Sequence, residues 1–159
     1  MAVAVREREN LHPTALDIGV AFLHPRRPMA SILAEPLLAV GRTHQGIPFS
    51  GSKGVLTDVF FLICSTTDRG HLRTLARLSR LVSDAAFLSG VRQAPDAFSL
   101  RRELNPSRFR RLFRSRISVA GGGNSGLPGL NLAKILLRGC HSDGIAPQMA
   151  AKNCLVTSN

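Results

Sequence analysis

The sequence predicts an α/β layer fold, and three observations lead to this class. Ile18–Leu23 is a short apolar run stopped by Pro25, which favours a buried strand over a core helix. Val55–Cys64 is rich in β-branched and aromatic residues and almost continuously apolar, which is typical of a central strand covered on both faces. In Asp68–Ser89 the apolar residues instead recur at helical spacing.

Shorter elements surround these segments. Residues 2–9 resemble the last turns of a helix, and residues 12–14 are predicted to turn, because a residue before proline avoids the helical region. Leu37–Val40 is a second apolar run, and the Gly, Ser and Pro content of Thr43–Gly54 indicates a connection. Residues 97–104 favour one further helix.

The long helix has a predicted apolar face and two predicted caps. Asp68 suits the N-cap and Gly90 the C-cap. The apolar face comprises Leu72, Leu75, Leu78, Val82 and Ala85, and the opposite, solvated face carries Arg73, Arg77, Arg80 and Asp84.

Composition limits the class of protein. A chain of 159 residues suits one domain, and its net charge of +11 divides into +4 over residues 1–104 and +7 over residues 105–159. A basic surface favours anionic partners such as nucleic acid, membrane or phosphate. Three cysteines show no metal-type spacing, and Cys64 is expected to be a buried free thiol. No segment has the length of a membrane span or signal peptide, so the expected compartment is the cytoplasm.

Two histidines lie at the ends of predicted elements. His24 directly follows the strand Ile18–Leu23, so the sheet would hold its backbone while the ring points at a ligand. His71 lies in the first turn of the helix after the central strand, where unpaired N–H groups and the helix dipole attract anions. The alternative for each is an ordinary surface histidine without a specific task. Because both histidines fall at the ends of predicted elements, their rings could meet over the same edge of the sheet.

Several spaced blocks resemble one protein family. The pattern RE-x4-T-x4-GVA-x2-H covers residues 8–24, and GIPF, VLTDVFFLIC and HLRTLARLSRLVSD follow in order. Over roughly residues 5–98 the chain resembles the IIA domains of the bacterial sugar phosphotransferase system, of the fructose/mannitol and nitrogen-regulatory type. The resemblance implies a mixed β-sheet flanked by helices, the mannitol/fructose-type fold, here incomplete.

The resemblance also implies a function and a site. Members accept a phosphoryl group on one histidine from the carrier protein HPr and pass it to a IIB domain, or use it as a regulatory mark. By matching position, His24 resembles the phosphorylated histidine and His71 the second active-site histidine. Arg8 and Thr14 resemble the arginine and the threonine of the same site. The chain is therefore predicted to be a phosphotransferase component, with a protein donor and no bound cofactor or metal.

These residue types suit phosphoryl transfer on chemical grounds as well. A neutral imidazole is a good nucleophile near pH 7, and the transfer then depends mainly on positioning and charge stabilisation. Arg8 offers two donors to phosphoryl oxygens. Arg26 and Arg27 suit the steering of a phosphorylated partner, with plain solvated charges as the alternative.

The chain departs from the family pattern in four places. Leu23 stands where the family usually has proline, and Ala15–Ile18 replaces a glycine-rich segment. The strand and two helices that precede the Arg-Glu pair in the family have no counterpart here, and the resemblance ends at about residue 105. The predicted organisation is a partial IIA-like domain, residues 1–104, and a basic, flexible tail, residues 105–159. A sheet without that strand is expected to expose an edge and to associate.

Three function classes remain open. The first is a phosphoryl carrier with His24 as the acceptor, and the second is a non-catalytic regulatory module of the same fold. The third is a basic nucleic-acid-binding protein that acts through its tail, which would bind in a strongly salt-dependent way. The first two are favoured, because a charged tail carries no specificity by itself.

Overall fold

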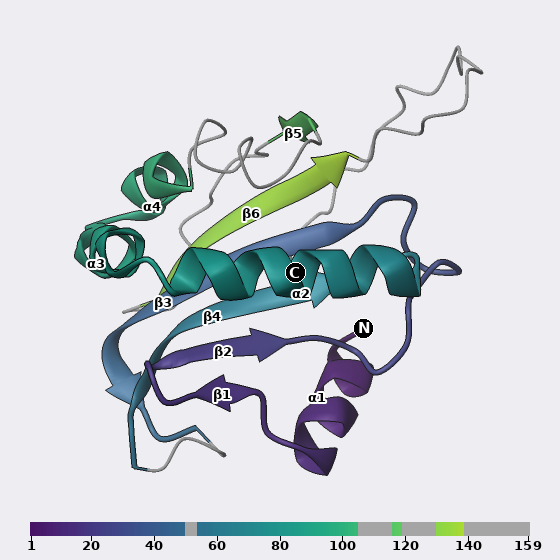
Figure 1. Cartoon of the computed structure of the whole chain (residues 1–159), viewed down its shortest axis with the longest axis horizontal. Helices are drawn as coiled ribbons and strands as arrows, with labels where there is room; N and C mark the ends of the chain where they lie inside the picture. Colours follow the sequence, from purple (N-terminus) through teal and green to yellow (C-terminus); the bar gives the residue numbers. More distant parts are fainter. Residues whose placement is uncertain (50–53, 105–115, 119–129, 139–159) are drawn as a thin grey trace, which may run out of the picture.

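The computed structural model describes residues 1–49, 54–104, 116–118 and 130–138, the last two ranges as backbone. The helices of this part are α1 (Ala2–Leu11), α2 (Asp68–Val82), α3 (Ala85–Gln93) and α4 (Ala97–Glu103) (Figure 1). Its strands are β1 (Ala15–Leu16), β2 (Val20–Leu23), β3 (Leu37–Ile47), β4 (Thr57–Cys64), β5 (Arg116–Ser118) and β6 (Leu130–Arg138). The helices predicted at residues 2–9 and 97–104 are thus confirmed as α1 and α4.

The strands form one sheet in the order β1-β2-β4-β3-β6-β5. β2 and β4 are parallel and every other neighbouring pair is antiparallel, so the predicted mixed sheet is confirmed. In the parallel pair Leu23 is in register with Leu62, and both strands therefore end at the same edge. The residues that follow β2 and β4 emerge side by side at this edge, where ligands bind in many sheets of this kind.

Helices α2 and α3 pack on one face of the sheet (Figure 1). The core between them is aliphatic and aromatic, and its fully buried members include Val20, Leu38, Val40, Val59, Phe61, Leu78, Phe87, Val91 and Leu100. Along β4, buried residues alternate with half-buried ones, and Asp58, Phe60 and Leu62 lie on the more open face. The prediction of a strand covered on both faces is therefore wrong, because the two helices cover only the face of Val59 and Phe61.

The predicted helix Asp68–Ser89 is two helices. α2 ends at Val82, and α3 begins after Asp84, whose carboxylate accepts hydrogen bonds from the backbone N–H groups two and three residues further on. Such a cap satisfies N–H groups that a continuous helix would bond to its own carbonyls, so it starts a new helix. Gly90 consequently lies inside α3 and is not a C-cap. At the other end, the N-cap is Thr67, whose hydroxyl accepts from the backbone N–H three residues on.

The face of α2 that packs on the sheet contains Leu78 and Val82, as predicted, with Leu75 against the edge of the core. Leu72 does not belong to this face, because 66% of its surface is exposed. It lies six residues before Leu78, the first fully buried residue of that face, which at roughly 100° per residue places it about 120° around the helix from Leu78. Its neighbour Arg73 is exposed, whereas Arg77 is half-buried.

Strand β3 differs from the prediction in its length and in its pairing. It extends through Ile47, with an irregular register between Arg42 and Ile47, so part of the region predicted as a connection is strand. Its far edge pairs with β6 from Leu37 to Thr43. The division at residue 104 stays a prediction, but two segments beyond it are strands of the same sheet, not flexible tail. Pairing explains this, because β6 bonds backbone groups that β3 would otherwise leave unpaired.

Some predictions concern residues outside this part of the chain. Residues 105–115, 119–129 and 139–159 belong to the predicted basic tail and lie outside the described residues.

Cys64 is a buried free thiol, as expected, and burial raises its pKa. No helix within the described ranges combines the length and the apolar character needed to cross a bilayer.

Candidate functional site

His24 and His71 are brought together at the edge where β2 and β4 end. His24 is the first residue after β2, and His71 lies in the first turn of α2, which follows β4. Their ring centroids are 4.8 Å apart, with the ring planes inclined by 48°. Both side chains are half-buried. The expectation that the two rings meet over one edge is confirmed, and it follows from the parallel pairing of β2 with β4.

A short hydrogen bond fixes the ring of His24. Its Nδ1 lies 2.7 Å from the carbonyl oxygen of Phe22, within β2. A carbonyl oxygen can only accept, so Nδ1 carries the proton and donates it. In the neutral imidazole the in-plane lone pair is therefore on Nε2. The strand thus selects Nε2 as the nucleophilic nitrogen of His24.

Both histidines are kept neutral near pH 7. Burial lowers the pKa of His24, Arg8 lowers it further, and the Phe22 carbonyl and the Glu9 carboxylate act in the opposite direction. Burial likewise lowers the pKa of His71, with additional lowering by His24 and Arg8 and some opposition from the acid at the start of α2. The neutral form is the one that can attack phosphorus.

Arg8 and Glu9, near the end of α1, have different roles. The charge of Arg8 acts on both histidine rings, while its Nη1 donates to the carbonyl of His12 at 2.5 Å. The carboxylate of Glu9 accepts from the backbone N–H of Thr14 at 2.8 Å and from its hydroxyl at 2.6 Å. The Thr14 carbonyl in turn accepts from the N–H of Phe22 at 3.3 Å. Thr14 therefore ties α1 to β2, and its hydroxyl proton is committed to Glu9.

Glu9 was not among the predicted site residues. The signal that could have found it is the Arg-Glu pair of the sequence, in which the acid follows the arginine directly. Its carboxylate binds Thr14 and its charge acts on His24, so it belongs to the same cluster.

A groove of about 360 Å³ lies beside the histidine pair, between α1 and the segment after β2. It is lined by Ala4, Glu7, Arg8, Leu11, Pro25, Arg26, Arg27, Pro28, Met29, Ser31 and Ile32. Arg8 is shared by the groove and the site, and Pro25 directly follows His24. Neither histidine lines the groove, whose lining is mainly apolar and includes three arginines and one glutamate.

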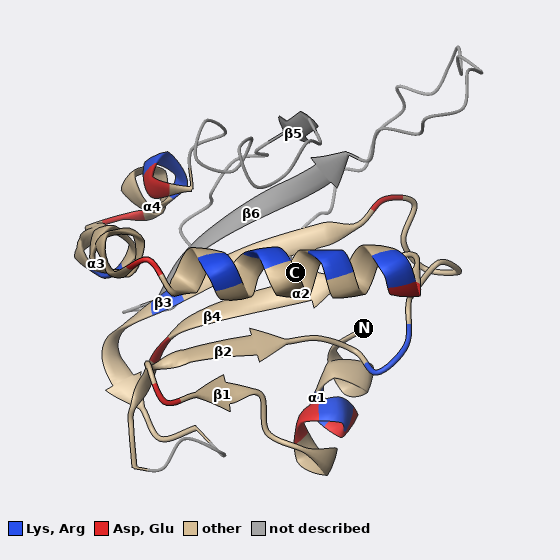
Figure 2. Ribbon diagram, viewed as in Figure 1, with Lys and Arg blue, Asp and Glu red and all other residues tan. Residues whose placement is uncertain are grey.

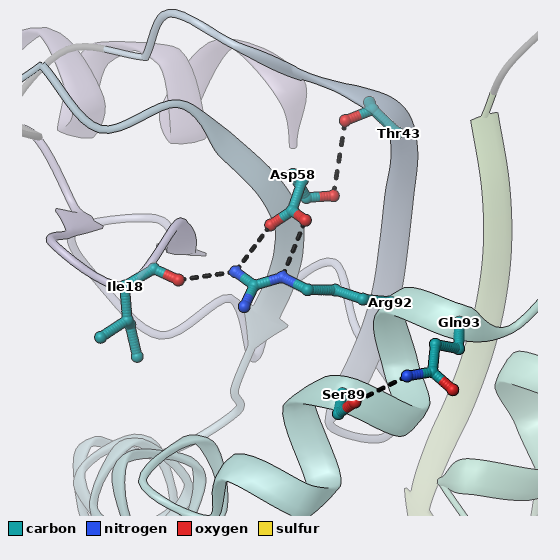
Figure 3. Close-up of polar contacts among 6 residues, drawn as sticks. All are labelled: Ile18, Thr43, Asp58, Ser89, Arg92 and Gln93. Atoms are coloured by element: carbon teal, nitrogen blue, oxygen red, sulfur yellow. Dashed lines mark hydrogen bonds and ion pairs between the residues drawn. The ribbon is translucent and has the colours of Figure 1, made fainter.

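The start of β2 is held by an ion pair that the sequence analysis missed. Arg92 of α3 donates from Nε and Nη2 to the carboxylate of Asp58 at 2.8 and 2.9 Å, and Nη2 also donates to the carbonyl of Ile18 at 2.6 Å (Figure 3). Gly19 follows with φ +77°, and a Cβ there would lie 2.8 Å from Nη2. Arg92 and Asp58 are 34 residues apart in the chain, so no local pattern reveals the pair.

Taken together, the site offers an unprotonated imidazole nitrogen, a second imidazole and an arginine charge within one cluster. This combination suits the acceptance of a small anionic group by a nitrogen nucleophile. Among the described residues, no group of three or more His, Cys, Asp or Glu side chains is arranged to hold a metal ion.

Comparison with protein families agrees with this geometry. Residues 1–105 match the family described as "Phosphoenolpyruvate-dependent sugar phosphotransferase system, EIIA 2". The chain belongs to this family. The predicted family and its α/β fold are thereby confirmed, and the match stops at the position where the sequence resemblance was expected to end. The EIIA 2 match includes all four predicted site residues, Arg8, Thr14, His24 and His71.

The chain is also similar to a curated protein of the nitrogen-regulatory type. A nitrogen regulatory protein from Bradyrhizobium diazoefficiens is 32% identical over 93 residues, which cover 57% of this chain and 59% of the relative. The chain therefore spans about three fifths of the relative's length. The name of the relative agrees with the nitrogen-regulatory type that the sequence predicted.

Proposed function

We propose that this EIIA 2 domain carries a phosphoryl group on His24, which it receives from an HPr-type donor protein. The observation that supports this most strongly is the hydrogen bond from His24 Nδ1 to the Phe22 carbonyl, with the ring of His71 beside it. That bond leaves Nε2 of His24 unprotonated, as a nucleophile requires.

The transfer exchanges one nitrogen–phosphorus bond for another. The bond in the donor's phosphohistidine breaks, and its electron pair stays on the donor imidazole, while Nε2 of His24 forms the new bond. The transition state is loose and spreads negative charge over three phosphoryl oxygens. In this proposal Arg8 and a ring N–H of His71 stabilise this charge, which is supported by the ring contact of His71 with His24 and by the influence of the Arg8 charge on both rings. The Phe22 carbonyl, bonded to Nδ1, stabilises the positive charge that the His24 ring acquires.

Two uses of the phosphoryl group are compatible with this chemistry. One is onward transfer to a IIB domain, as in sugar transport. The other is a regulatory mark that changes which partners the domain binds, and the name of the nitrogen regulatory relative favours this use. Incubation of the phosphorylated domain with IIB domains separates them, because only a carrier in a transport chain loses its label to such an acceptor.

Intact-mass measurement tests the proposal. The chain is incubated with an HPr-type donor, its phosphorylating enzyme and phosphoenolpyruvate. We expect the wild type to gain one acid-labile phosphoryl group, and His24→Ala to gain none. A His24→Ala variant that still acquired acid-labile phosphate would exclude His24 as the acceptor.

A further inference from the structure

The outer face of α2 presents an exposed leucine between two exposed arginines. Leu72 is 66% exposed, and Arg69 and Arg73 are exposed on either side of it. Positions three and four residues apart are neighbours on a helix surface, so these side chains form one patch. Figure 2 shows the basic residues recurring along α2. A large apolar side chain left in solvent among cations contributes little to this domain's own core.

The patch borders the candidate site. His71 directly precedes Leu72, and its ring contacts that of His24. In the segment after His24, Arg26 and Arg27 are exposed as well. Within the part of the chain that the structure describes, none of these four arginines forms an ion pair. The histidine pair is therefore flanked by cations from two separate segments, with an apolar side chain on one of them.

We propose that this surface receives the phosphoryl donor, and that the donor's contact face is acidic with an apolar centre. The surface, named here the docking face, consists of Arg26, Arg27, Arg69, Leu72 and Arg73. The inference rests on the proposed function, because a donor must bring its phosphohistidine within bonding distance of His24 Nε2. Any protein that does so covers the first turn of α2 and the segment that follows β2.

The make-up of the docking face points to the chemistry of its partner. Transient protein interfaces combine an apolar centre with a polar rim, and complementary charge speeds encounter. The arginines require an anionic partner, and the leucine requires an apolar contact that a sugar-phosphate backbone does not offer. An acidic protein surface satisfies both, whereas nucleic acid would be recognised by the arginines alone.

Phosphoryl transfer from a purified, phosphorylated HPr-type donor tests the proposal. In the double variant Arg69→Glu/Arg73→Glu we expect the KM for the donor to rise about tenfold, because the reversed charges repel an acidic face. The kcat should stay within about twofold, because neither side chain belongs to the catalytic cluster. The wild-type kcat/KM should fall as ionic strength rises, and this dependence should weaken in the variant. Leu72→Ser should raise KM with the salt dependence unchanged.

A matched control separates a local surface from net charge. Arg80→Glu/Arg102→Glu changes the net charge equally at two exposed positions, one in the last turn of α2 and one on α4. We expect this control to keep the wild-type KM. An equal rise in KM for the control, an unchanged KM in both docking-face variants, or a wild-type rate that increases with salt would each overturn the proposal.

Binding of the unphosphorylated donor distinguishes this inference from the proposed function. Titration of donor into the His24→Ala protein, with and without the Arg69→Glu/Arg73→Glu change, measures the affinity for the donor even if His24 accepts no phosphate. We expect the double change to weaken binding about tenfold. Unchanged donor binding would overturn the docking face. If, in addition, a single-stranded oligonucleotide bound the wild type and not the charge-reversed protein, the surface would be assigned to nucleic acid.

Discussion

Removal of the Arg92 guanidinium tests how the start of β2 is held. Arg92 donates twice to Asp58 and once to the carbonyl of Ile18. The two charged side chains are 38% and 23% exposed, so water screens their interaction in part. We therefore assign the pair about 1 kcal/mol, the upper end for partly exposed pairs, because its geometry is bidentate. The Ile18 bond adds about 1 kcal/mol.

The expected effect of Arg92→Ala is thus a loss of about 2 kcal/mol in the free energy of unfolding. For a chain of this size that corresponds to a fall in Tm of roughly 4–8 °C. A double-mutant cycle with Asp58→Ala, measured by urea denaturation, should give a coupling of about 1 kcal/mol. The control Arg102→Ala removes an exposed arginine of α4 and should stay within about 0.5 kcal/mol of wild type. A coupling near zero, or an Arg92→Ala effect no larger than the control, would refute this account of the turn.

Three further predictions concern the start of β2 and the histidine site. Gly19→Ala should cost about 1–3 kcal/mol in thermal or urea unfolding, because φ is +77° and the new Cβ would lie 2.8 Å from Arg92 Nη2; a wild-type Tm would contradict this. His71→Ala and Arg8→Ala should each slow phosphorylation roughly a hundredfold in a time course and leave the label on His24, whereas wild-type rates would remove both residues from the site. The lowered pKa values of His24 and His71 mean that the unfolded chain binds more protons below about pH 6.5. The free energy of unfolding should accordingly fall between pH 7.5 and pH 5.5, and it should fall less in the variant His24→Gln/His71→Gln; an equal pH dependence in both would contradict the shifts.

The features that could be predicted from the sequence are those with a local cause. The apolar run before His24 predicted β2, and the β-branched run that ends at Cys64 predicted β4. Asp96 directly precedes α4 and caps it locally. The meeting of His24 with His71 was also within reach, because the ends of parallel neighbouring strands share an edge. The family blocks then supplied roles that spacing alone could not.

The features that were missed depend on residues far apart in the chain. The Asp58–Arg92 pair joins β4 to α3, and the pairing of β6 with β3 joins the tail to the sheet. The hydrogen bond that sets the tautomer of His24 depends on the geometry at the end of β2, which a sequence motif does not specify.

Nitrogen-resolved NMR of the phosphorylated domain tests the central claim most directly. Long-range proton–nitrogen correlations on uniformly ¹⁵N-labelled protein identify both the histidine and the ring nitrogen that carry phosphorus. The structure predicts a phosphoryl group on Nε2 of His24, with Nδ1 still protonated and bonded to the Phe22 carbonyl. Phosphorus on Nδ1 of His24, or on either ring nitrogen of His71, would contradict it.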